Sequence, residues 1–98
     1  MQILETRAGA TLVLSLQGRL DSVSAQSLEN VIKVSLGGIE RLVFDFAGLS
    51  YVSSAGLRVL LSAQKQMNKQ GEMALRNVSA SIMEVFEITG FSGILTVE

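Results

Sequence analysis

The spacing of hydrophobic positions at the start of the chain predicts two short strands. Residues 2–7 and 11–17 are separated by Ala8-Gly9-Ala10, and leucine occupies every second position from Leu12 to Leu16. A period of two is typical of a strand with one buried face, and a short glycine-containing break is typical of a hairpin turn. We therefore predict that the chain opens with an antiparallel β-hairpin.

A helical spacing follows the hairpin. Apolar residues recur at intervals of three and four, at Ala25, Leu28, Val31, Ile32 and Leu36. This stripe predicts an amphipathic helix packed on a core. Candidate N-caps precede the stripe at Asp21, Ser22 and Ser24, and Gly37-Gly38 is expected to end the helix.

The stretch from residue 41 to residue 61 is the most apolar part of the chain. We predict a buried strand over Arg41–Phe46, a loop over Ala47–Ser53, and a helix from Ser54 or Ala55 to about Gln70. Asp45 is the one charged residue in this strand, and an unpaired buried carboxylate is costly. We expect it near the strand's carboxyl end, hydrogen-bonded to loop amides.

The last third of the chain predicts a strand, a helix and a final strand. A short strand is expected over Glu72–Asn77, and a third helix is expected to begin at Ser79 or Ser81 and to end at Thr89-Gly90. Ser81 and Glu84 have the spacing of a capping box. A last strand is predicted over Ile94–Val97.

This order, β-β-α-β-α-β-α-β, predicts a single α/β domain over residues 1–98. Strands that alternate with helices favour crossover connections, and hence a mixed, mostly parallel sheet with helices packed on it.

Composition removes several classes of function. The chain has 98 residues, a net charge of -1 and scattered basic residues, so it lacks the basic surface that nucleic-acid binding needs. It has no cysteine and no histidine, which removes disulfides, the usual zinc ligands and an imidazole general base. We expect no metal, no cofactor and no catalytic residues. A serine hydrolase, in particular, would lack its histidine.

The N-terminal residues and the lengths of the apolar runs bear on localisation. MQILETRAG has neither the basic flank nor the apolar core of a secretory signal. No apolar run approaches the ~20 residues that a membrane helix needs. We expect a cytoplasmic protein that does not bind membranes, and we favour a monomer.

Paired serines occupy the position where functional groups gather in such a fold. Carboxyl ends of neighbouring strands share one edge of the sheet, so the segments 18–24 and 47–54 are expected to bring Asp21 close to Ser53 and Ser54. The N–H groups at a helix start are unpaired and carry partial positive charge, so an anion on either serine would be accommodated. The alternative, favoured on chemistry alone, is that a serine is only an N-cap. Asp21 is likewise either a cap or a group that orients an acceptor hydroxyl.

Four motifs together resemble the STAS domain family, in its bacterial anti-sigma factor antagonist type. They are Gly18-Arg19-Leu20-Asp21, DFAGLSYVSSAGL at residues 45–57, Asn77-Val78-Ser79, and Thr89-Gly90-Phe91. Their order and spacing cover nearly the whole chain.

The resemblance implies that Ser54 accepts a phosphoryl group from a partner that is both anti-sigma factor and serine kinase. The unphosphorylated protein would bind this partner and free a sigma factor, and a phosphatase would reset the cycle. Asp21 and Asp45 correspond to two family acids. Many members have aspartate where this chain has Ser53, and a second serine where it has Ala55. Ser53 is therefore the second choice for modification, and a constitutive interaction or ligand-sensing module stays open as an alternative.

We also expect a partner-binding surface around Ser54. Its predicted members are Asp21, Ser22, Leu49, Tyr51, Val52, Ser53 and Gly56. For the apolar residues the alternative is that they pack the loop onto the helices. Among the serines, we assign Ser54 as the phosphoacceptor and Ser53 as the cap.

Overall fold

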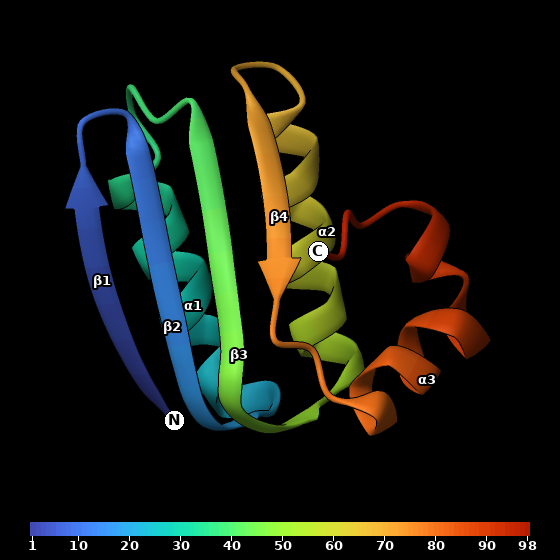
Figure 1. Cartoon of the computed structure of the whole chain (residues 1–98). Coiled ribbons are helices and arrows are strands. Elements are labelled where there is room, and N and C mark those ends of the chain that lie inside the picture. Colours follow the sequence, from blue (N-terminus) through green and yellow to red (C-terminus); the bar gives the residue numbers. More distant parts are fainter.

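The protein is a four-stranded sheet with two helices on one face and a third beyond its β4 edge (Figure 1). The structure, a computed structural model, describes all 98 residues. In chain order the elements are β1 (Gln2–Ala8), β2 (Thr11–Leu20), α1 (Ser22–Ser35), β3 (Arg41–Val52), α2 (Ser54–Met67), β4 (Glu72–Arg76), α3 (Ala80–Thr89) and a 3-10 turn, Phe91–Gly93. No helix combines the length and the apolar character that a membrane span would require.

The sheet has the strand order β1-β2-β3-β4. The first two strands are antiparallel and form the predicted hairpin, while β3 runs parallel to both β2 and β4. The helices α1 and α2 cover the same face of the sheet (Figure 1). The predicted mixed, mostly parallel α/β fold is therefore confirmed.

The core lies between the sheet and this helical layer. The alternating leucines of β2 point into it and are fully buried, as is Phe44 on β3. Phe46 extends the core toward α3, because its ring centroid lies 6.3 Å from that of Phe44 and 6.5 Å from that of Phe86 on α3. This aromatic contact attaches the third helix to the sheet.

The third strand is longer than predicted, and the expected loop over Ala47–Ser53 is wrong. β3 continues to Val52, where it pairs with Leu20, so β2 also extends beyond its predicted end at Gln17. The pairing shifts twice because β3 has one extra residue between Asp45 and Gly48 and another between Leu49 and Tyr51. Such bulges tolerate the small residues that resemble a loop in the sequence.

Side chains stabilise both bulges. The Ala47 N–H donates to the Asp45 carboxylate at 3.0 Å. The Ser50 hydroxyl donates to the Gly18 carbonyl at 2.9 Å, across to the neighbouring strand. The two bulges let β3 run on beside β2 until both strands end together.

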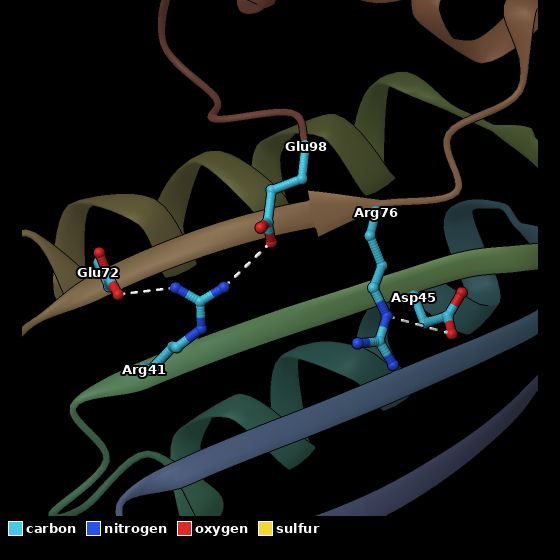
Figure 2. Close-up of polar contacts among 5 residues, drawn as sticks. All are labelled: Arg41, Asp45, Glu72, Arg76 and Glu98. Carbon is cyan, nitrogen blue, oxygen red and sulfur yellow. Dashed lines mark hydrogen bonds and ion pairs between the residues drawn. The ribbon is translucent and has the colours of Figure 1, made fainter.

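The predicted last strand is reduced to one bridge, between Leu75 and Val97. The Leu75 N–H donates to the Thr96 carbonyl and its carbonyl accepts from Glu98 N–H, both at 2.8 Å. This bridge and its two hydrogen bonds join the segment after the 3-10 turn to β4. The Glu98 carboxylate reaches Arg41, whose guanidinium also contacts Glu72 (Figure 2).

Two helix boundaries differ from the prediction. Ser79 caps α3 by accepting from the Ile82 N–H at 3.3 Å, so the expected capping box of Ser81 and Glu84 is wrong. Because α3 begins at Ala80, Ser81 lies inside the helix and cannot be its N-cap. α2 ends at Met67 rather than near Gln70.

Candidate functional site

The candidate site lies where β2 and β3 end side by side and α1 and α2 begin (Figure 1). The Ser53 N–H donates to the Leu20 carbonyl at 2.8 Å. This bond joins the residue before α2 to the residue before Asp21. The structure thus brings together the two segments that the strand order predicts to meet.

The two serines at the start of α2 have different environments. Ser53 has an extended backbone, and its hydroxyl accepts from the Gly56 N–H at 3.1 Å, so it is the N-cap of the helix, as predicted. Ser54 is the first helical residue, it is exposed, and its hydroxyl makes no hydrogen bond within the chain. Ser53 therefore caps α2, and the Ser54 hydroxyl has no hydrogen-bond partner within the chain.

Asp21 caps α1 through one of its two carboxylate oxygens. Oδ1 accepts from the Val23 N–H at 3.1 Å, from the Ser24 N–H at 2.9 Å and from the Ser24 hydroxyl at 3.0 Å. In return, the Ser24 hydroxyl accepts from the Asp21 N–H at 2.9 Å. The bond from the Ser24 N–H is the main reason that the pKa of Asp21 lies below its ordinary value. The second carboxylate oxygen, Oδ2, makes no hydrogen bond within the chain.

Gly56 allows the start of α2 to come close to the end of β2. It is buried, and a Cβ placed on it would lie only 2.7 Å from Cγ of Leu20. A side chain here would push α2 away from the end of β2. Gly56 thus sets the distance between α2 and the sheet, and it is buried rather than exposed on the predicted partner-binding surface.

The same correction applies to two apolar residues. Leu49 and Val52 are only 4% and 7% exposed, and both belong to the hydrophobic core. Their positions in a strand that faces α1 and α2, rather than in a loop, explain their burial. Their role is packing, which was the alternative interpretation of these residues.

Tyr51 is the apolar candidate that does reach the surface, with 40% of its side chain exposed. The Arg19 guanidinium lies 4.2 Å from the centroid of its ring, and the two residues pair across β2 and β3. A guanidinium over an aromatic face is a favourable cation–π contact. The sequence alone does not reveal Arg19 as a surface partner of Tyr51, because their pairing depends on the second bulge. We call Arg19, Asp21, Ser22, Tyr51 and Ser54 the Ser54 surface.

Asp45 does not belong to that surface. It lies mid-strand in β3, opposite Arg76 at the end of β4, and Figure 2 shows the two side chains facing each other. Its carboxylate accepts from the Asn77 side-chain amide and from the Ala47 N–H, both at 3.0 Å. The Asn77 bond, followed by the Ala47 bond, holds the pKa of Asp45 below its ordinary value. The expected hydrogen bonds from amides are present, but the expected position near the carboxyl end of the strand is wrong, because β3 continues through Ala47 to Val52. No three acidic side chains gather into a group that could hold a metal.

A groove of about 640 Å³ separates α1 and α2 next to the Ser54 surface. Its lining combines apolar and polar side chains: Ser22, Ala25, Gln26, Glu29, Ile32, Lys33, Ala55, Arg58, Val59, Ser62 and Gln66. Glu29 and Lys33 form an ion pair of 3.5 Å across one helical turn. Arg58 has no ion-pair partner.

The sequence matches the model of the STAS domain family over residues 2–98. BtrV of Bordetella bronchiseptica is 38% identical over 99 aligned positions, which cover 99% of this chain and 85% of BtrV. The anti-sigma-B factor antagonists of Listeria monocytogenes and Bacillus subtilis are 32% and 30% identical. These alignments cover 83% and 86% of this chain, and 73% and 78% of the two relatives.

Solved structures show the same fold at lower identity. SpoIIAA, in its unphosphorylated form, superposes with a TM-score of 0.79 at 21% identity, over 99% of this chain and 87% of SpoIIAA. An anti-sigma factor antagonist from Mycobacterium paratuberculosis has a TM-score of 0.87 at 21% identity, over 98% of this chain and 83% of that protein. The fold is therefore similar to both.

Proposed function

This chain belongs to the STAS domain family, and we propose that it is an anti-sigma factor antagonist controlled by phosphorylation of Ser54. In this proposal the unphosphorylated protein works in the cytoplasm, where it binds an anti-sigma factor that is also a serine kinase and so releases a sigma factor. Phosphorylation ends the binding, and a phosphatase restores it. The protein is a substrate and a binding partner rather than an enzyme. The names of its relatives support the antagonist role.

The observation that carries the proposal is that the hydroxyl of one serine caps α2 while the hydroxyl of the other has no hydrogen-bond partner. The Ser53 hydroxyl holds the helix start, whereas the Ser54 hydroxyl is exposed and free of hydrogen bonds. A kinase can therefore phosphorylate Ser54 without removing the cap of α2. In the transfer, the Ser54 oxygen bonds to the γ-phosphorus of ATP, the bond to ADP breaks, and the hydroxyl proton passes to a base of the kinase.

The fold itself should tolerate the phosphate. Phosphorylation adds about -1.5 to -2 charges. At the exposed start of α2 these charges meet the unpaired N–H groups and the positive end of the helix dipole, which stabilise an anion by about 0.3 to 1 kcal/mol. The modification is thus expected to leave the fold intact.

A partner seated on the Ser54 surface faces the opposite situation. Covering the phosphate removes its water, which costs several kcal/mol for each charge that stays unpaired. Each ~1.4 kcal/mol corresponds to a factor of ten in affinity. One phosphate on Ser54 is therefore enough to lower partner affinity by about two decades or more.

The direct test of the site is to incubate the protein with its kinase and ATP and to locate the phosphate by mass spectrometry. We expect one phosphate on Ser54. The variant Ser54→Ala should take up none, and the matched variant Ser53→Ala should still be modified. An unmodified peptide containing both serines, or a phosphate on Ser53, would contradict the proposal.

The groove between α1 and α2 favours a second candidate function. A concave surface with an apolar floor and polar rim suits a small ligand or a peptide. In this alternative the protein is a constitutive interaction or ligand-sensing module that is not regulated by phosphorylation. Unchanged partner affinity after Ser54→Asp would favour it.

A further inference from the structure

Arg58 lies one helical turn after Ser54 on the exposed side of α2. Residues four apart on a helix are neighbours, with Cβ atoms about 5–6 Å from each other. Helical side chains also lean toward the N-terminus of their helix. These two rules put the Ser54 hydroxyl within reach of the long side chain of Arg58.

No other basic residue both lies close to Ser54 along the helix and lacks an ion-pair partner. Four of the eight basic residues are already engaged, in ion pairs or on an aromatic ring: Arg19, Lys33, Arg41 and Arg76. Arg7 donates to the carbonyl of Gly9 in the hairpin turn. The two lysines that follow on the α2 side, Lys65 and Lys69, are ~16 Å or more along the helix from Ser54 at about 1.5 Å per residue. Arg58 alone combines proximity with a guanidinium that makes no ion pair.

The backbone at the start of α2 offers donors to the same place. The N–H groups of Ser54 and Ala55 have no acceptor within the chain, whereas that of Gly56 is taken by Ser53. These two N–H groups belong to Ser54 and its neighbour, and Arg58 follows one turn later, so all three donors lie within about one helical turn of a group on the Ser54 oxygen. All of these donors are unused in the unmodified protein.

We infer that Arg58 binds the phosphate of phosphorylated Ser54. The inference rests on the proposed function, because it requires that Ser54 is modified. A guanidinium can donate two parallel N–H groups to two phosphate oxygens, and such charge-assisted pairs are among the stronger polar contacts in proteins. The phosphate is then held against its own helix.

This contact also alters the groove between α1 and α2. Arg58 lines the groove and is its one charge without a counter-ion, since Glu29 and Lys33 neutralise each other. When Arg58 pairs with the phosphate, the groove loses that unpaired positive charge. Phosphorylation of Ser54 therefore changes the groove as well as the Ser54 surface.

The test installs phosphoserine at position 54 during translation, so that no kinase is needed. Melting temperatures are measured for the full chain with and without the phosphate, in the natural sequence and in Arg58→Gln. The phosphate should raise the melting temperature of the natural sequence by about 4 to 8 °C more than that of Arg58→Gln, the shift that corresponds to about 1 kcal/mol in a domain of this size.

Two matched variants and one spectroscopic signal separate this contact from a general charge effect. Arg19→Gln removes the other arginine near the site, and Lys65→Gln removes a more distant charge from the same helix. Both should keep the natural response to the phosphate. In the phosphorylated natural protein, the Arg58 Nε–H resonance should move downfield. An equal response in Arg58→Gln, or a response lost in Arg19→Gln instead, would overturn the inference. Either result would leave kinase modification of Ser54 untouched.

Discussion

Replacing Ser53 by alanine removes the oxygen that accepts from the Gly56 N–H at 3.1 Å, whereas the same change at Ser54 removes an exposed hydroxyl without a partner. The two substitutions delete the same atom at adjacent positions. They differ only in whether that atom caps α2. Together they test the structural basis of the proposed modification site.

The expected magnitudes follow from these contacts. Loss of a serine cap costs about 1 kcal/mol, with a range of about 0.5 to 2. In a domain of this size each kcal/mol lowers the melting temperature by about 4 to 8 °C. Ser54→Ala should change the free energy of unfolding by no more than about 0.5 kcal/mol, as exposed substitutions usually do. Alanine is also a slightly better helix former than serine.

Thermal and urea unfolding followed by circular dichroism measure both changes. Ser53→Asp is the matched control, because aspartate caps helices as well as serine does. It should retain the natural stability. Equal losses in Ser53→Ala and Ser54→Ala would refute the assignment of the cap to Ser53 alone.

Two further substitutions test the packing and the electrostatics around the site. Gly56→Ala places a Cβ 2.7 Å from Cγ of Leu20, and it should destabilise the fold by about 1 to 3 kcal/mol in urea unfolding, as overpacking does; natural stability would mean that α2 is not held this close. The pKa of Asp45 is lowered in the folded state, so its contribution to stability is present above its ordinary pKa of 3.8 and is lost as pH falls through the folded value. In Asp45→Asn the free energy of unfolding should therefore fall less steeply below about pH 4 than in the natural sequence. An equally steep fall in both proteins would contradict the role of the Asn77 and Ala47 contacts.

Local periodicity was enough to predict most of the fold. The alternating leucines of β2 and the stripe of α1 identify their elements because each pattern repeats within a few residues. The parallel order then placed Asp21 beside the serines, since neighbouring strands end at one edge. The assignment of Ser53 as cap followed from the family resemblance, which gave Ser54 the role of phosphoacceptor and left Ser53 to cap the helix.

The bulges of β3 could not be predicted in this way. Ala47, Gly48 and Ser50 have the composition of a loop, and only pairing with β2 shows that they continue a strand. That register decides which side chains face the helices. The sequence pattern, which indicates a loop here, therefore puts Leu49 and Val52 on the surface although they are buried. It also creates the contact between Arg19 and Tyr51, which are far apart in the sequence.

The measurement that tests the central claim most directly compares the affinity of the anti-sigma factor for the unmodified protein and for the protein with phosphoserine at position 54. We predict a loss of about 100-fold or more on phosphorylation, which corresponds to at least ~2.8 kcal/mol. The melting temperature of the protein alone should not fall. Equal affinity of the two forms for the anti-sigma factor would contradict the account.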